Sequence, residues 1–126
     1  MSLSILAIDD SRTMRSLLSS ALGRVGYTVD LAEDGNDGLD RFENSDPDVV
    51  ITDINMPNLD GFGFIEAARK MTRDRVVPIL VLTTESAPEL RARARSAGAT
   101  GWIVKPFDDE KLVWAIERVA DTKGRA

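Results

Sequence analysis

Acidic, amide, hydroxyl and lysine side chains follow four short apolar runs of the chain, at the point where each run ends. In chain order, these residues are Asp9, Asp10, Asp53, Asn55, Thr83, Thr84 and Lys105. Carboxylate oxygens are the ligands that Mg²⁺ prefers, and a lysine and a hydroxyl suit the oxygens of a phosphoryl group. If one edge of the fold gathers these residues, their types predict magnesium-dependent phosphoryl chemistry.

Each of these residues also has an ordinary structural explanation when it is taken alone. Asp9 and Asp10 would serve as the N-cap of a helix, and Thr83 would cap another. The stretch 53–57 would make a loop with Asx-turns, and Lys105 would be a solvated lysine before Pro106. The conjunction favours a shared site, because residues of the right types follow four different strands.

The central carboxylate is the expected nucleophile. Three carboxylates at one place repel one another unless a cation lies among them. The sequence has no histidine and no cysteine, which points to a hard divalent ion such as Mg²⁺. Asp53 would then form an acyl phosphate, while Lys105 supplies a second positive charge and Thr83 a hydroxyl donor.

The elements that must position these residues alternate between strands and helices. Strands are expected at residues 4–8, 27–32, 48–52, 76–82 and 102–104. Apolar residues at helical spacing predict helices at 14–25, 35–43, 62–71 and 87–97, and a last helix that Asp108 caps. The last helix would bury Leu112, Ile116, Val119 and Ala120.

Five successive βα units predict an α/β fold with a doubly wound, parallel, five-stranded sheet. A strand order of 2-1-3-4-5 would make the first and third strands neighbours, so that their three carboxylates converge at the functional edge. The whole chain, 1–126, is expected to be one domain without an output domain, and 121–126 a flexible tail.

Composition argues against several classes of function. The net charge of −5 disfavours a role on nucleic acid or on a membrane surface. No apolar run approaches the length that spans a bilayer, and no signal peptide is recognisable at the N-terminus. A cytoplasmic location follows as an expectation, and without histidine the chain cannot carry a phosphohistidine.

The chain resembles the receiver domains of two-component response regulators over essentially its whole length. Within that family it is most similar to CheY-type chemotaxis regulators, with their flavodoxin-like fold. The motifs that carry the resemblance are Asp9-Asp10-Ser11, Thr52-Asp53-Ile54-Asn55-Met56-Pro57, Leu59-Asp60-Gly61, Leu82-Thr83-Thr84 and Lys105-Pro106-Phe107.

The resemblance implies a role for each matching residue. Asp53 looks like the phosphoacceptor, and Asp9 and Asp10 look like the magnesium-binding pair. Asn55 would add its backbone carbonyl to the metal, and Lys105 would pair with a phosphate oxygen. Thr83 looks like the switch hydroxyl that moves to the phosphate. Its neighbour Thr84 would narrow access to the phosphoacceptor.

The resemblance further implies how phosphorylation is read out. Trp102 stands where the family places its switch aromatic, and the Lys105-Pro106 peptide is expected to be cis. Asn55 and Glu85 would flank the phosphate and tune its hydrolysis. Two arginines on one side of the fourth helix are a candidate partner patch, or else a solvated face; they are Arg91 and Arg95.

The implied partners are a CheA-like sensor histidine kinase, a flagellar switch protein or another target, and a phosphatase. The kinase would dock near the first helix, and the target on the face of the fourth helix, fifth strand and fifth helix. The chain would be a monomer and a phosphoacceptor that assists its own turnover, rather than an enzyme. Nucleic acid and membrane insertion are not expected.

Rival functions remain open at this point. Within the family, the chain would alternatively be a phosphate sink or a phosphorelay intermediate. A phosphatase of the haloacid-dehalogenase type also uses an aspartate nucleophile and Mg²⁺, but it needs an acid where this chain has Asn55. A flavodoxin-like FMN module would need a Ser/Thr/Gly-rich loop after the first strand, where this chain has two aspartates. A GTPase is excluded, because the chain has no G-x-x-x-x-G-K sequence.

Overall fold

Five strands alternate with five helices in this computed structural model, which describes residues 2–74 and 76–122. The strands are β1 (Ser4–Ile8), β2 (Thr28–Ala32), β3 (Val49–Thr52), β4 (Ile79–Thr83) and β5 (Gly101–Val104). The helices are α1 (Arg12–Gly23), α2 (Gly35–Glu43), α3 (Gly61–Lys70), α4 (Pro88–Ala97) and α5 (Asp109–Thr122). The predicted alternation of strands and helices is confirmed.

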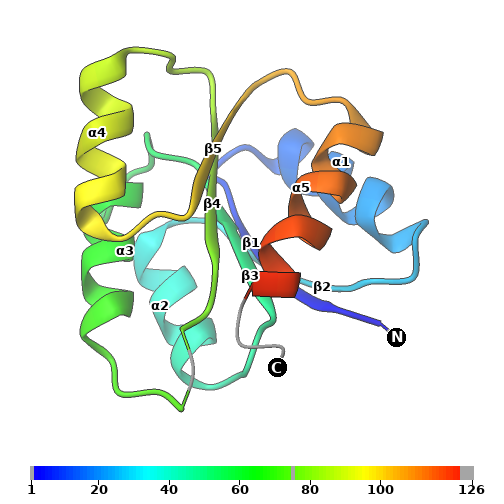
Figure 1. Cartoon of the computed structure of the whole chain (residues 1–126), viewed down its shortest axis with the longest axis horizontal. Coiled ribbons are helices and arrows are strands. Elements are labelled where there is room, and N and C mark those ends of the chain that lie inside the picture. Colours follow the sequence, from blue (N-terminus) through cyan, green and yellow to red (C-terminus); the bar gives the residue numbers. More distant parts are fainter. Residues whose placement is uncertain (1, 75, 123–126) are drawn as a thin grey trace.

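All neighbouring strands of the sheet are parallel, in the order β2-β1-β3-β4-β5. Helices α2, α3 and α4 cover one face of this sheet, and α1 and α5 cover the other (Figure 1). The predicted doubly wound fold and its strand order are therefore confirmed. In the register of β1 and β3, Ile8 lies beside Thr52, so the residues that follow these two strands leave the sheet together.

The core consists of two apolar clusters, one on each face of the sheet. In the first cluster, Phe42 of α2 and Phe64 of α3 meet edge to face. In the second, Leu22 of α1 packs with Leu112 and Ile116 of α5. Every residue of β3 and β4 is buried. Burial on both faces explains why these strands are continuous apolar runs in the sequence.

Short polar side chains lie at the start of four of the described helices. At α5, the Asp108 carboxylate accepts a hydrogen bond from the Glu110 N–H, which agrees with the predicted cap. Ser11 caps α1 by accepting a hydrogen bond from the Met14 backbone N–H, and Asp60 caps α3 through the Gly63 N–H. Asp34 caps α2, and the hydrogen bond from the Asp37 backbone N–H lowers the pKa of its carboxyl group. Because Ser11 is the cap of α1, capping of that helix does not account for Asp9 and Asp10.

Three details differ from the sequence-based expectations. The helical spacing of residues 14–25 predicts that Leu17 and Val25 face the core, yet they are 51% and 48% exposed, and α1 ends at Gly23, before Val25. The fourth strand begins at Ile79 rather than at residue 76, and Val76 is 72% exposed. Residues 121 and 122 continue α5 instead of starting a tail, and the rest of the expected tail, 123–126, lies outside the described residues.

Within the described ranges, none of the helices is both long enough and apolar enough to cross a bilayer.

Gly61 allows the start of α3 to pass close to the end of β3. A Cβ atom at this position would lie 2.2 Å from the Asp53 backbone oxygen. We expect Gly61→Ala to lower the free energy of unfolding by at least about 2 kcal/mol, because backbone atoms must move apart. The measurement is denaturant unfolding followed by circular dichroism.

Gly23→Ala is the matched control for this prediction. A Cβ atom at Gly23 would meet nothing within 4 Å, and the residue lies in the last turn of α1. Alanine favours a helix over glycine by up to about 1 kcal/mol, so this variant should be as stable as the parent or more stable. Equal stability of the two variants would contradict the steric argument at Gly61.

Candidate functional site

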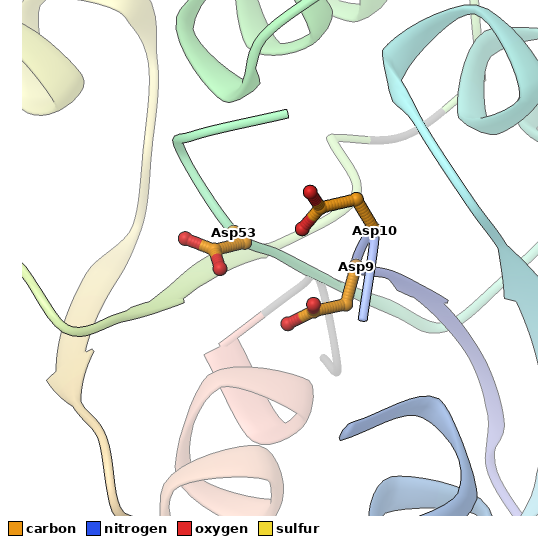
Figure 2. Close-up of side chains that lie close together, drawn as sticks. All are labelled: Asp9, Asp10 and Asp53. Atoms are coloured by element: carbon orange, nitrogen blue, oxygen red, sulfur yellow. The ribbon is translucent and has the colours of Figure 1, made fainter. Parts of the chain in front are cut away.

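Three carboxylates meet at the carboxyl edge of the sheet. Asp9 and Asp10 follow β1, and Asp53 follows β3 (Figure 2). One oxygen of each carboxylate lies within 4.8 Å of the others. Asp9 is 1% exposed and Asp53 is 8% exposed, whereas Asp10 faces solvent. The adjacency of β1 and β3 thus creates the predicted acidic cluster.

Asp53 is held by its backbone neighbours. Its own N–H donates to the Ile8 carbonyl at 3.0 Å, which ties it to the end of β1. The Ile54 N–H donates to its side-chain Oδ1 at 2.6 Å. Gly61 N–H then bonds to the Ile54 carbonyl at 2.9 Å, so the loop after β3 folds back over the site.

Lys105 joins the two buried carboxylates. Its Nζ lies 2.8 Å from Asp9 Oδ2 and 2.7 Å from Asp53 Oδ2. Burial lowers the pKa of Lys105, but its hydrogen bonds to Asp53 and Asp9 outweigh burial and leave the pKa above its usual value. The Lys105-Pro106 peptide bond is cis, as the resemblance implied.

One lysine does not fully compensate the acidic cluster. Burial raises the pKa of Asp9, and the hydrogen bonds from Lys105 and from the Ser11 N–H offset this only in part. Three ionised carboxylates and one ammonium sum to a formal charge of −2. A divalent cation with oxygen ligands would balance this charge, so the donor set of Asp9, Asp10 and Asp53 fits Mg²⁺.

Thr83 is the last residue of β4 and is fully buried. Its Oγ1 accepts a hydrogen bond from the Glu85 N–H at 3.3 Å. Within the described part of the chain, no side-chain hydrogen bond joins Thr83 to the carboxylates. Thr84 lies just past the strand and is exposed, so the structure places both threonines at the functional edge without direct contact to the acids.

Glu85 connects three of the predicted residues. Asn55 Nδ2 donates to Glu85 Oε2 at 2.8 Å, and Trp102 Nε1 donates to the Glu85 backbone oxygen at 3.0 Å. Together with the bond to Thr83, these contacts make Glu85 the link between the loop after β3 and strand β5. The resemblance implied that Asn55 and Glu85 flank a phosphate, but it did not predict the link to Trp102.

Arg15 is a residue of the site that the sequence reasoning missed. Its Nη1 donates to the Asp9 backbone oxygen at 2.7 Å, so it fixes the peptide between the two metal-ligand candidates. One sequence feature could have indicated this role. Arg15 is a basic residue in the first turn of α1, where the helix dipole disfavours a positive charge, so a local partner for its side chain is expected.

The two candidate partner arginines lie apart from the acidic cluster. Arg91 and Arg95 line one hollow together with Trp102, which confirms that they share a side of α4. The Arg91 guanidinium lies 6.0 Å from the Trp102 ring centre. Arg93, between them in sequence, instead lies 4.0 Å from the Phe62 ring centre.

Comparison with known families and proteins agrees with this geometry. The model of the response regulator receiver domain family matches residues 5–117. The chemotaxis protein CheY1 of Helicobacter pylori is 37% identical over 94% of this chain and 97% of its own length. The "Probable transcriptional regulator ycf27" of Guillardia theta is 38% identical over 97% of this chain and 47% of its own length.

A third relative is a longer signalling protein. The sensor histidine kinase CheAY of Helicobacter pylori is 34% identical over 95% of this chain, which spans 15% of that protein. The chain therefore spans less than half of ycf27 and of CheAY, but nearly all of CheY1.

Solved structures share the fold closely. The chemotaxis protein CheY4 of Vibrio cholerae has 41% identity and a TM-score of 0.89, over 94% of this chain and 99% of that chain. The receiver domain of the sensor histidine kinase PA1611 from Pseudomonas aeruginosa has 27% identity and a TM-score of 0.88, over 95% and 98%. In that structure a magnesium ion is coordinated in the active-site cleft.

Proposed function

The chain belongs to the response regulator receiver domain family, and from this premise we propose that Asp53 accepts a phosphoryl group from a sensor histidine kinase. The observation that carries the proposal is the Lys105 ammonium, which lies between the Asp9 and Asp53 carboxylates at hydrogen-bond distance from both. Buried ion pairs add little net stability to a fold. The position of this cation is therefore better explained by the negative charge of a transferred phosphoryl group, which it would stabilise.

In the proposed transfer, a carboxylate oxygen of Asp53 attacks the phosphorus of the kinase's phosphohistidine. An O–P bond forms, the P–N bond breaks, and the leaving imidazole keeps the electron pair and takes up a proton. The Ile54 N–H holds Asp53 Oδ1, so the nucleophile is oriented before the donor arrives. Lys105 then exchanges part of its contact with the carboxylates for a phosphoryl oxygen.

Magnesium is the proposed cofactor. Asp9, Asp10 and Asp53 would hold it, with the Asn55 backbone carbonyl as a further ligand. Bound there, the ion would neutralise charge on the phosphoryl oxygens. The magnesium in the PA1611 receiver domain supports this assignment.

We propose a phosphoacceptor rather than an enzyme that turns over a substrate. A phosphatase with an aspartate nucleophile needs a second acid two residues later, and this chain has Asn55 there. The Asn55 amide is engaged with Glu85 at 2.8 Å, and that pair would set how fast the acyl phosphate is hydrolysed. The exposed Thr84 would limit the approach of a donor or of a partner phosphatase to Asp53.

The signal would leave the site through the loop after β4. Phosphorylation would draw the Thr83 hydroxyl toward the new phosphate, and the Glu85 amide that now donates to it would move with it. Because Trp102 donates to the Glu85 carbonyl, the indole would respond in turn. The face of α4, β5 and α5 would then change its affinity for a target.

The most specific biological role we propose is chemotaxis, with a CheA-like kinase as the phosphoryl donor and a flagellar switch protein as the target. The proposed location is the cytoplasm, which supplies the ATP that a histidine kinase consumes. CheY1 and CheY4 support this role, because the chain matches 97% and 99% of their lengths. The sensor histidine kinase CheAY, which matches 95% of this chain, supports a CheA-like histidine kinase as the donor. A phosphate sink or relay is the alternative, and binding of the phosphorylated form to a flagellar switch peptide would separate the two.

The test of the proposed chemistry is intact mass spectrometry after incubation with a small-molecule phosphodonor. We expect a gain of one phosphoryl group that requires Mg²⁺ and disappears with a chelator. A phosphorylated histidine kinase serves as the second donor. No gain from either donor would overturn the proposal.

Trp102 reports the proposed switch directly. The sequence has two tryptophans, so a Trp114→Phe background leaves Trp102 as the only one. We expect its emission to change on phosphorylation, because the Glu85 carbonyl that accepts its N–H moves. Adding Asp53→Asn to that background should abolish the change, and unchanged emission of fully phosphorylated protein would contradict coupling through Glu85.

A further inference from the structure

The strand β5 forms one edge of the sheet and lies on the proposed output face. Among the described strands, β5 pairs with β4 alone. The Lys105 N–H donates to the Thr83 carbonyl at 2.7 Å, so odd-numbered positions at this end of the strand point toward β4. Backbone groups alternate in direction along a strand. The N–H and C=O groups of Trp102 and Val104 therefore point away from the sheet.

A hollow lies on each side of this edge. One, of about 250 Å³, lies between α4 and β5, and the other, of about 780 Å³, lies between β5 and α5. Residues 100–102 line both hollows. Figure 1 shows α4 on one side of β5 and α5 on the other. The free backbone edge of β5 therefore lies between the two hollows and contributes residues to both.

The charge of these hollows is opposite to that of the protein. Every ionisable side chain that lines them is a cation: Arg91 and Arg95 on the α4 side, and Lys111 and Arg118 on the α5 side. None of the four takes part in an ion pair within the described residues. In a chain of net charge −5, this local excess of positive charge favours an acidic ligand.

An indole ring lies in each hollow beside the cations. Trp102 on β5 is half-buried and lines both hollows, and Trp114 on α5, which lines the hollow between β5 and α5, is 60% exposed. The Arg118 guanidinium lies 4.9 Å from the Trp114 ring centre. Large exposed aromatic surface next to a free strand edge is suited to apolar side chains that alternate to the two sides of an added strand.

From these features we propose that the free edge of β5 binds an extended acidic segment of a partner protein, which adds to the sheet as a sixth strand. The main-chain groups of Trp102 and Val104 would supply the hydrogen bonds, the two hollows would take alternate apolar side chains, and the four cations would pair with acidic residues. This inference rests on the proposed function, because it names the partner chemistry of the same output face.

A second copy of the chain fits this edge poorly. Edge-to-edge pairing of two β5 strands would bring the cations of one copy against those of the other. Charged residues beside an edge strand are a common means by which proteins prevent self-association. The same charges attract an acidic strand, so they select a foreign segment over a second copy.

The test uses a short capped peptide, Glu-Asp-Ile-Phe-Val-Asp-Glu, as the probe. Titration into ¹⁵N-labelled protein, with and without phosphorylation, gives the affinity and the residues affected. We expect slowed amide hydrogen exchange at Trp102 and Val104, which docking through side chains alone would not cause. A peptide N-methylated at its central amides should bind at least about tenfold more weakly, because two hydrogen bonds are lost.

Charge reversal provides the second arm of the test. Arg95→Glu and Lys111→Glu should each weaken binding about tenfold. Lys70→Glu, an exposed reversal on α3 away from the hollows, should change it by no more than about twofold. A peptide of the same apolar core with lysines in place of its acids should not bind.

The outcomes separate this inference from the proposed function. A chain that gains phosphoryl mass but binds no probe in either state overturns strand addition alone. Binding without protection of Trp102 and Val104, or equal binding of the N-methylated peptide, also overturns it. A chain that gains no mass overturns the proposed phosphoryl chemistry, whatever the probe does.

Discussion

Asp53→Asn is expected to abolish phosphorylation completely while leaving the protein folded. The amide oxygen is not a competent nucleophile for an acyl phosphate. Its shape is that of the carboxylate, so it can still accept the Ile54 N–H that now donates to Asp53 Oδ1. Intact mass with either donor, together with denaturant unfolding, measures both parts of this expectation.

Asp74→Asn is the matched control for this variant. Asp74 is exposed and lies after α3, outside the acidic cluster, and the chemical change is the same. We expect the control to gain one phosphoryl group at the rate of the parent. A gain of undiminished size in Asp53→Asn would show that another residue is the acceptor, and it would sink the assignment of Asp53.

The convergence of the carboxylates was predictable from the sequence because it depends on few facts. Parallel strands direct their carboxyl ends to one edge, and the order 2-1-3-4-5 makes β1 and β3 neighbours. The convergence of the three carboxylates therefore follows from the strand order alone and does not depend on how the side chains of the core pack. The same reasoning brought Lys105 to this edge, but it could not show that its Nζ would bridge Asp9 and Asp53.

The extent of burial on α1 was less predictable. Leu17 fits the helical period, and Val25 would continue it past the end of α1 at Gly23, yet only the narrower stripe of Leu18, Ala21 and Leu22 is buried on this helix. Periodicity gives the direction of the apolar face but not the width of the neighbouring surface that covers it. How much of that face is covered depends on how the other elements pack, which no local pattern contains.

The contacts of Glu85 lay beyond the sequence for a different reason. Trp102 donates to a backbone carbonyl, and Arg15 likewise donates to the Asp9 carbonyl. A backbone acceptor is present at every residue, so residue types cannot reveal which one is used. The resemblance indicated that Trp102 matters, whereas the structure identified the atom through which it is connected.

Lys105→Met is expected to slow phosphorylation by about 100-fold, the usual cost of removing one preorganised charge from a phosphoryl or oxyanion site. Methionine keeps an unbranched side chain of similar length but leaves Asp9 and Asp53 without their shared cation. Their mutual repulsion then rises, and so does the attraction of the cluster for a divalent ion. Magnesium affinity should therefore increase while the rate falls.

These opposite changes distinguish a role in the transfer from a loss of structure. Damage to the site would lower magnesium affinity and rate together, whereas loss of charge alone separates them. The rate comes from the time course of mass gain, and the affinity from a magnesium titration of Trp102 emission in the Trp114→Phe background. Lys105→Arg keeps the charge but not the compact ammonium, so it should retain more of the rate than Lys105→Met. A Lys105→Met protein that is phosphorylated as fast as the parent would mean that Lys105 only pairs the two buried carboxylates.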